Sequence, residues 1–367
     1  MVKYEDLLSI DKIKNVYENI RTNTCHKEKL VRFELAFTSN IVYILDILRR
    51  KEYNHHHYNV FLIKEPKYRI IMSETLGDKI VNHLISHYAL LPSLEKKFIN
   101  TNVATRKGMG TKKGIEYLKK FINREKENFD KLYVLKCDIS KYFYNIDHEI
   151  LLNKLRKDIT DPDIYNVVKN IIESTEKVEV NKFIDSAVKR EIARITQMGL
   201  TDLDKKKKEL SYLPRYKNGK GLPIGNETSQ ILAIYYLSDF DHFIKEKLRI
   251  KNYVRYMDDF LIVHHDKEYL KEVLKIIGDE VHKLKLELNI KTQIYDLNKG
   301  FDFLGYKFVL KEKRLIVLLR NQNKKRIKRK LRRLKRKGGK KYELVKASYK
   351  GYFMMANARE FLYRLKL

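Results

Sequence analysis

Hydrophobic and polar positions divide the chain into helical segments and short strand-like runs. Over residues 1 to about 50, apolar side chains recur at intervals of three and four, the spacing of one face of an amphipathic helix. Residues 60–72 instead hold two runs rich in β-formers around a turn at Pro66, which predicts a β-hairpin. The charged stretch from about 150 to 215 is again helical in pattern.

Acidic residues interrupt two further β-rich runs. Residues 132–143 form an apolar run that reaches Asp138, and residues 252–263 form two apolar runs joined by Asp258 and Asp259. The second pattern predicts a hairpin whose turn holds two neighbouring carboxylates, which repel each other unless water or a divalent cation lies between them. An acidic surface turn is the alternative for an isolated pair. If the first run lies beside the hairpin, three carboxylates converge and can hold two Mg²⁺ ions about 3.5–4 Å apart, the arrangement of nucleotidyl transfer.

Glycine-rich loops precede two predicted helices. Residues 104–111 are basic and contain two glycines, which let backbone amides approach phosphates before a helix that begins near Lys113. The loop lacks the Gly-Lys-Ser/Thr ending of a P-loop, and a plain turn remains the alternative. Residues 220–230 contain Pro and two glycines, and we expect Thr228 or Ser229 to begin the apolar helix that follows.

The chain is strongly basic, with 78 Lys and Arg against 47 Asp and Glu and a formal net charge of +31. Such an excess predicts a polyanionic partner. Thirteen of the eighteen residues 324–341 are Lys or Arg, while Ile327, Leu331 and Leu334 form one apolar stripe. A helix of this kind can dock on the protein and present its cations to a nucleic-acid backbone. A membrane-surface helix is the rival, but the stripe is short and has no aromatic residue.

Length and the remaining motifs set limits. With 367 residues we expect two or three domains. No run of eighteen apolar residues and no secretion signal is present, so we expect a cytoplasmic protein of a bacterial, phage or archaeal host with no membrane partner. Cys25 and Cys137 are far apart and predict neither a disulfide framework nor a Cys-based zinc site. Residues 55–57 are three consecutive histidines, for which a solvated loop is preferred over a zinc site.

The ordered motifs from about residue 60 to 310 resemble those of reverse transcriptases. The Tyr256-Met257-Asp258-Asp259 box is similar to the signature of the family, and Asp138 matches its first catalytic aspartate. The resemblance implies that Asp138, Asp258 and Asp259 hold two Mg²⁺ ions, with Mn²⁺ as the alternative ion and the Ile139 carbonyl as a further ligand.

The resemblance also implies an α+β fold, a right-hand polymerase with fingers and palm built from an antiparallel sheet plus helices and with a C-terminal helical thumb. The implied domains are an N-terminal helical extension over residues 1–55, fingers over 56–130, a palm over 131–308 with a fingers-type helical insertion at about 150–215, and a basic thumb over 309–367. The chain ends just past this thumb, so we expect no RNase H, integrase or homing-endonuclease domain.

Further residues match family motifs. Arg69, helped by Lys67, is implied to bind the incoming triphosphate, since a guanidinium fork suits phosphate oxygens. Phe143, five residues after Asp138, matches the aromatic steric gate against a 2′-hydroxyl, and Lys291 matches the lysine that protonates pyrophosphate. The residues implied to bind dNTP are Lys67, Arg69, Phe143, Ile224, Gly225 and Gln230. Those implied to bind template or primer are Arg106, Tyr256, Met257, Phe303, Leu304, Gly305, Arg326, Arg329, Arg332 and Arg333.

One motif departs from the common pattern of the family. Most reverse transcriptases carry Gln-Gly-x-x-x-Ser-Pro, whereas this chain has Ile224 before the glycine and Gln230 after the serine. This form resembles the enzymes of diversity-generating retroelements, which act with an RNA template, a DNA primer or cDNA, dNTPs and a small basic accessory protein. Ile224 cannot donate a hydrogen bond to the nucleotide, so the resemblance implies error-prone synthesis opposite template adenine.

Two other functions stay open at this point. One is a reverse transcriptase of a phage-defence, retron or intron-derived lineage, including synthesis without a template. Ile224 and Gln230 argue against the retron and intron types, which usually keep Gln and Pro. The other is a non-catalytic RNA-binding scaffold, which the loss of an aspartate from the triad would indicate, and all three aspartates are present.

Overall fold

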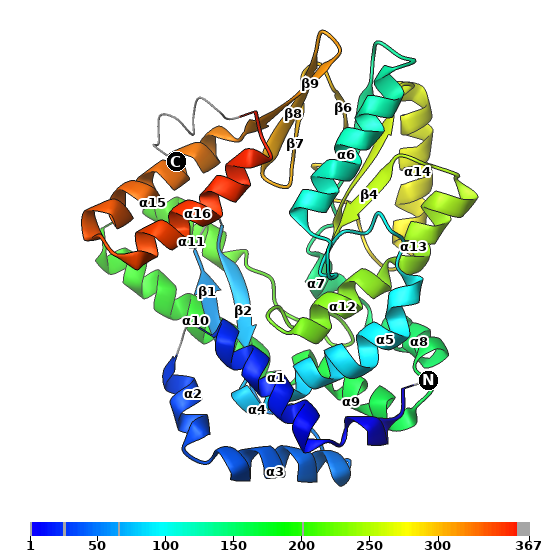
Figure 1. The fold of residues 1–367 in the computed structure, drawn as a ribbon. Helices are drawn as coiled ribbons and strands as arrows, with labels where there is room; N and C mark the ends of the chain where they lie inside the picture. The colour runs from blue at the N-terminus through cyan, green and yellow to red at the C-terminus, as the bar shows by residue number, and fades with distance from the viewer. Residues whose placement is uncertain (1, 25–26, 65–66, 200–201, 358–367) are drawn as a thin grey trace. The chain divides into compact units, whose positions relative to one another are not determined.

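The computed structural model describes residues 2–24, 27–64, 67–199 and 202–357, which alternate helices with antiparallel strands (Figure 1). The expected mixture of helices and antiparallel sheets is confirmed. Cys25, Pro66 and the end of the chain lie outside the described residues. Contacts divide the chain into two compact units. The first unit consists of Met1–Ile99, Ser140–Asp241 and Val281–Glu287, and the second of Asn100–Ile139, His242–Glu280 and Leu288–Leu367.

The first unit begins with helices, as the three- and four-residue spacing predicted. Ser9 caps the first long helix, its hydroxyl accepting a hydrogen bond from the Lys12 amide at 3.4 Å. The apolar face of this helix is buried through Ile13, Val16 and Ile20. These N-terminal elements are η1 (Tyr4–Leu7), α1 (Ile10–Asn23), α2 (Lys27–Glu34) and α3 (Phe37–Arg49).

The hairpin predicted over residues 60–72 is present as β1 (Asn59–Ile63) and β2 (Arg69–Ser73). The two strands pair antiparallel with Ile63 opposite Arg69. Val60, Ile70 and Met72 form its buried face, which belongs to one apolar cluster with residues of α10 (Val178–Gln197). The hairpin is therefore held by packing against a long helix as well as by its own ladder.

Most of the remaining first unit is helical, including the predicted stretch from 150 to 215. One boundary is a correction: the helix expected to begin at Thr228 or Ser229 begins at Glu227, after Asn226. The reason is tertiary, because the Thr228 hydroxyl donates to Asn82 Oδ1 at 2.6 Å instead of capping the helix. These elements are α4 (Leu76–Ile85), η2 (Ser86–Leu90), α5 (Leu91–Leu94), η3 (Glu95–Lys97), α7 (Tyr142–Asn145), α8 (His148–Asp158), α9 (Pro162–Glu173), η4 (Ser174–Glu176), α11 (Leu203–Ser211), α12 (Glu227–Tyr236) and α13 (Ser238–His242).

A four-stranded antiparallel sheet with the order β4-β5-β3-β6 forms the centre of the second unit. The run that reaches Asp138 supplies β3, and the run that contains Asp258 and Asp259 supplies β4 and β5. The helix α6 packs against β4 and β5 (Figure 1). Buried Val134, Val254 and Leu261 form its core face together with Leu118 of the helix. The elements are α6 (Thr111–Lys126), β3 (Tyr133–Cys137), η5 (Phe243–Lys247), β4 (Tyr253–Tyr256), β5 (Asp259–His264), α14 (Lys267–Lys283) and β6 (Gln293–Asp296).

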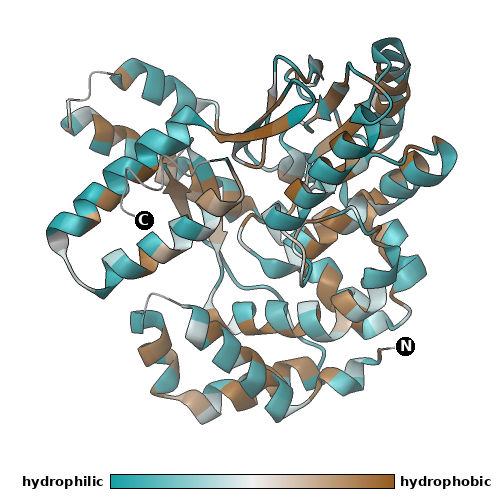
Figure 2. Ribbon diagram, turned by 45° about the horizontal axis from the view of Figure 1, so that its top comes forward, coloured by the Kyte–Doolittle hydropathy of each residue, from teal (hydrophilic) through white to brown (hydrophobic). Residues whose placement is uncertain are grey.

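The second unit ends in a three-stranded sheet and two helices. The strands are β7 (Phe301–Phe303), β8 (Tyr306–Lys311) and β9 (Arg314–Leu319), and the helices are α15 (Asn321–Lys337) and α16 (Lys340–Met354). The predicted apolar stripe of α15 is buried in the core of this unit, so the docked arrangement is confirmed. Figure 2 shows hydrophobic segments recurring along otherwise hydrophilic helices. In the described part of the chain, no helix is long and apolar enough to cross a membrane.

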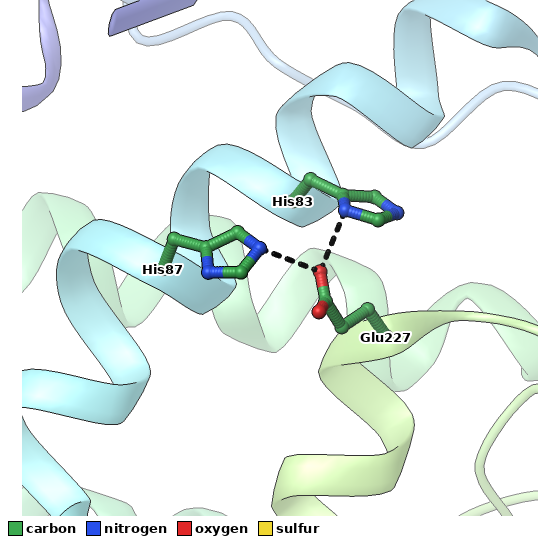
Figure 3. A group of neighbouring side chains, drawn as sticks. All are labelled: His83, His87 and Glu227. Carbon is green, nitrogen blue, oxygen red and sulfur yellow. Dashed lines mark ion pairs between the residues drawn. The ribbon is translucent and has the colours of Figure 1, made fainter. Parts of the chain in front are cut away.

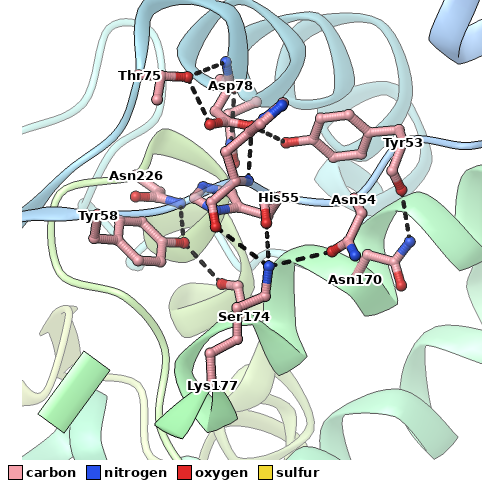
Figure 4. Close-up of polar contacts among 12 residues, drawn as sticks. Tyr53, Asn54, His55, Tyr58, Thr75, Asp78, Asn170, Ser174, Lys177 and Asn226 are labelled. Carbon is pink, nitrogen blue, oxygen red and sulfur yellow. Dashed lines mark hydrogen bonds and ion pairs between the residues drawn. The ribbon is translucent and has the colours of Figure 1, made fainter. Parts of the chain in front are cut away.

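The histidine run differs from the solvated loop that its sequence suggested. His56 and His57 are exposed, but His55 is fully buried and stacks on Tyr58 with ring centroids 4.2 Å apart. Figure 4 shows the surrounding contacts, in which Asn226 donates to the Tyr58 hydroxyl at 3.2 Å. Burial lowers the pKa of His55 to about 4, because an imidazolium would lose its hydration there. A neutral ring therefore serves as a core side chain in this loop.

Glu191 of α10 ties the hairpin to its supporting helix, and its titration gives a first prediction. Arg194 at 2.8 Å and Lys64 at 3.1 Å hold the pKa of this buried carboxyl down at about 2, below its ordinary 4.5. A depressed pKa stabilises the fold above about pH 4.5, and that contribution is lost as pH falls toward 2.

We expect Glu191→Gln to destabilise the protein at pH 7 by on the order of 1 kcal/mol, a value kept small because both cationic partners are half-exposed and screened. Urea denaturation of the two proteins between pH 7 and pH 3 measures the difference, which should shrink below about pH 4.5. Glu179→Gln, at an exposed position of the same helix, is the control. A difference that stays constant over the whole range would contradict this account.

Candidate active site

The three aspartates lie at the same end of the four-stranded sheet. β3 pairs antiparallel with β5 so that Cys137 faces Phe260, and the next position on each strand is Asp138 and Asp259. Residues opposite each other in an antiparallel pair point to the same face. Asp258 completes the group in the turn between β4 and β5, where Met257 has a φ of +57°. The non-local pairing that the sequence could only assume is thus present.

Asp259 has the environment of a cation ligand. Its Oδ1 is buried and makes no hydrogen bond among the described residues, while its Oδ2 lies 3.4 Å from the Lys136 ammonium. Burial, together with the charges of Asp138 and Asp258, raises the pKa of Asp259 to about 7 against the opposing effect of Lys136. A divalent ion would satisfy the orphaned oxygen and neutralise this repulsion, so the donor set fits such an ion.

Arg255 supports the turn from inside the sheet, a role that the sequence analysis missed. Its side chain is fully buried, and its guanidinium donates to the Met257 carbonyl at 2.9 Å. Its backbone is fixed as well, because its amide donates to Thr101 and its carbonyl accepts from Val103. An arginine within an otherwise apolar strand is the sequence signal that could have revealed it.

The segment around Lys291 lies beside Asp138. The Asn289 amide donates to the Asp138 carbonyl at 2.7 Å, and the Thr292 hydroxyl accepts from the Asp138 amide at 3.4 Å. Lys291 is exposed within this turn, and the buried Ile139 forms an isolated bridge with Leu288. The neighbours of Lys291, the predicted general acid, therefore contact the backbone of Asp138, the first aspartate.

The predicted Phe-Leu-Gly hairpin is the turn between β7 and β8. Leu304 and Gly305 have φ values of +47° and +89°, which suit a tight two-residue turn. The Gly305 carbonyl accepts from the hydroxyl of Tyr352 at 2.9 Å and from the amide group of Asn323 at 3.1 Å. The helices α16 and α15 thus hold this turn, while Phe303 lies in the core.

The second unit also contains the basic residues expected to bind template or primer. In the loop before α6, Arg106 donates to the Asn102 carbonyl at 3.2 Å, and the Gly110 amide donates to the Val103 carbonyl at 2.7 Å. Hydrogen bonds within the loop and with the residues just before it therefore hold its conformation. The four arginines expected to contact nucleic acid are all exposed on α15, namely Arg326, Arg329, Arg332 and Arg333.

In the first unit, the loop that carries Ile224 lies against the hairpin. The Met72 amide donates to the Ile224 carbonyl at 2.8 Å. Gly225 has a φ of +142°, and a Cβ at this position would lie 2.4 Å from the Met72 carbonyl oxygen. Only glycine allows this close approach. The structure therefore brings Ile224 and Gly225 next to the strand that begins at Arg69.

Phe143 contacts the same loop through its backbone. Its carbonyl accepts from the Leu222 amide at 2.7 Å, and the Ile146 carbonyl accepts from the Gly221 amide at 2.8 Å. Phe143 is half-buried. Lys67, Arg69 and Gln230 are exposed. All six residues expected to bind dNTP belong to the first unit, whereas the aspartates and Lys291 belong to the second.

An antiparallel sheet that carries carboxylates at a hairpin turn, with an unpaired buried oxygen of Asp259 among them, offers ligands that suit a divalent cation and phosphate chemistry. The sequence model of one family, described as "Reverse transcriptase (RNA-dependent DNA polymerase)", matches residues 62–308. The match covers more than half of the chain, so the chain belongs to the reverse transcriptase family. Domains of this family use divalent metal ions.

Other comparisons add less. No curated protein matches the chain. Among solved structures, a telomerase from Candida albicans, determined in complex with a TWJ fragment of telomeric RNA, is similar with a TM-score of 0.48 and 14% identity. That likeness covers 73% of this chain, and this chain spans about half, 47%, of the telomerase chain.

Proposed function

We propose that this chain is an RNA-directed DNA polymerase that makes cDNA from an RNA template. The observation that carries the proposal is the pairing of β3 with β5, which sets Asp138 opposite Asp259 beside the Asp258 turn. A non-catalytic scaffold would have no use for three converging carboxylates, whose mutual repulsion costs stability. Primer extension by the purified chain on an RNA template, with dNTPs and Mg²⁺, is the direct test.

Each residue has one task in this proposal. Asp138, Asp258, Asp259 and the Ile139 carbonyl hold two Mg²⁺ ions, which activate the attacking oxygen and stabilise the leaving oxygen when bound. Arg255 holds the Met257 carbonyl and so fixes the turn that presents the carboxylates. Lys291 donates a proton to the pyrophosphate. Arg69 and Lys67 bind the triphosphate, and both side chains are exposed to solvent, where a ligand can reach them.

Nucleic acid is bound by the second unit in this proposal. Exposed arginines of α15 contact phosphates, and the Leu304–Gly305 turn contacts the primer end. Phe143 excludes the 2′-hydroxyl of ribonucleotides. The partners are an RNA template, a DNA primer and dNTPs, together with a small basic accessory protein. The fingers, palm and thumb boundaries stay as predicted from the sequence.

The lineage proposed is that of diversity-generating retroelements. Ile224 supports this choice, since its backbone is fixed by the Met72 amide while its side chain offers no hydrogen bond to a nucleotide. A polymerase that lacks this positioning contact discriminates less between correct and incorrect pairs. Error-prone synthesis opposite template adenine follows from the proposal.

We expect Ile224→Gln to lower misincorporation opposite template adenine by about 10-fold, the effect of one recovered hydrogen bond of roughly 1.4 kcal/mol. Deep sequencing of cDNA made on a defined RNA measures the error spectrum. Ile224→Leu, which stays apolar at similar volume, is the control and should leave the spectrum unchanged. An unaltered error rate opposite adenine in the Gln variant would show that Ile224 does not determine the error rate. Product formed without template would favour the phage-defence lineage.

A further inference from the structure

Two histidines and a glutamate converge in the first unit, away from the residues assigned above. Nδ1 of His83 lies 2.7 Å from Glu227 Oε2, and Nε2 of His87 lies 3.4 Å from the same oxygen (Figure 3). One ligand atom from each residue lies within 4.8 Å of the others. The three side chains could therefore share one metal ion.

The chain builds this convergence into two helices. His83 and His87 are four residues apart across the junction of α4 and η2, so both imidazoles lie on one face. Glu227 is the first residue of α12. The neighbouring residues Asn82 and Thr228 are joined by a buried hydrogen bond of 2.6 Å, which locks the two helices together beside the cluster. The three side chains therefore meet on a rigid support.

Three potential ligand atoms gather around one buried carboxylate oxygen. The imidazole nitrogens of His83 and His87 both face Glu227 Oε2, at 2.7 and 3.4 Å. A tetrahedral ion with bonds of 2.0–2.1 Å separates its ligand atoms by about 3.4 Å. The spacing of 3.4 Å between His87 and Glu227 already matches this value, and the spacing of 2.7 Å between His83 and Glu227 has to open by about 0.7 Å.

The geometry points to a binding site for a transition-metal ion of the zinc class, formed by His83, His87 and Glu227. Two imidazoles and one carboxylate are borderline ligands that favour such ions over Mg²⁺, and three protein ligands leave a fourth position for water. The side chains of His83, His87 and Glu227 are 24%, 45% and 31% exposed, so an ion can enter from solvent. The bound ion joins the start of α12 to α4 and so fixes the adjoining Ile224–Asn226 loop.

The test uses the full chain, freed of metal by chelation and then supplied with millimolar Mg²⁺, which occupies the aspartate site. Co²⁺ serves as the probe because nitrogen ligation at low coordination number produces strong visible absorption. We expect one equivalent of Co²⁺ to produce these bands, Zn²⁺ to abolish them, and either ion to raise the thermal midpoint. Template, primer and dNTPs are absent, so the result does not depend on polymerase activity.

The variants separate the site from general histidine binding. His83→Gln with His87→Gln should remove the bands, and Glu227→Gln alone should weaken Zn²⁺ binding by at least about 10-fold, the low end of the loss for an outer partner. His242→Gln is the matched control, because His242 forms an exposed pair with Glu246 at 2.6 Å and should leave binding unchanged. Circular dichroism verifies that each variant is folded. Absence of the bands in the unaltered chain, or their full retention in the double histidine variant, would overturn the proposal.

Discussion

Primer extension is expected to fall by at least about 10³-fold when Asp258 and Asp259 are both replaced by Asn. The bound cations supply several kcal/mol of transition-state charge stabilisation, and each 1.36 kcal/mol is a factor of ten in rate. Asn keeps the size of the side chain but removes the charge that holds a hard cation. The measurement is the single-turnover rate of nucleotide addition on an RNA template at saturating Mg²⁺.

Stability distinguishes this loss from misfolding. In the metal-free protein, Asp259 is a buried carboxylate whose pKa is raised to about 7 by burial and by its acidic neighbours. The ionised form therefore weakens the fold above about pH 7, and a neutral amide relieves that cost. We expect the double variant to be at least as stable as the unaltered chain in urea at pH 8 with a chelator present.

Asp279→Asn is the control for the same chemical change. Asp279 is exposed on α14 of the second unit and should be replaced without loss of activity. Metal-dependent extension that survives the change of Asp258 and Asp259 would refute the assignment of the active site.

Gly225→Ala is expected to destabilise the first unit by about 2–5 kcal/mol, the sum of overpacking and of backbone strain. The added Cβ would lie 2.4 Å from the Met72 carbonyl oxygen, and the φ of +142° is one that an L-residue rarely adopts. Hydrogen exchange at the Met72 amide is the sharpest measurement, because that amide donates to the Ile224 carbonyl. Its protection should fall together with the unfolding midpoint.

Gly77→Ala provides the comparison within the same unit. A Cβ at Gly77 meets only the Thr75 hydroxyl oxygen at 4.0 Å, and its φ is ordinary for a helix. We expect it to be neutral or to stabilise by about 0.4–1 kcal/mol through the unfolded chain. Equal behaviour of the two alanine variants would show that the close approach at Gly225 has no energetic consequence.

Helices and hairpins were predictable because their signals are local. Three- and four-residue spacing predicted α1 and the stripe of α15, and paired β-rich runs predicted both the β1–β2 and the β4–β5 hairpins. The start of α12 was predicted wrongly, since Thr228 resembles a capping residue until its hydroxyl is seen to donate to Asn82. The burial of His55 was missed because three adjacent histidines resemble a solvated loop, although one of them stacks on Tyr58, three residues further along the chain.

By itself, the sequence determined which residues have the chemistry of a reverse transcriptase and in what order they occur, because residue types and short spacings are written directly in the chain. Only the tertiary structure decided that Asp138 faces Asp259, that a buried Arg255 holds the intervening turn, and that Glu227 meets two histidines 140 or more residues upstream. The reason is physical. Strand register and helix packing bring distant residues together, and the burial that follows changes how a carboxylate or an imidazole behaves.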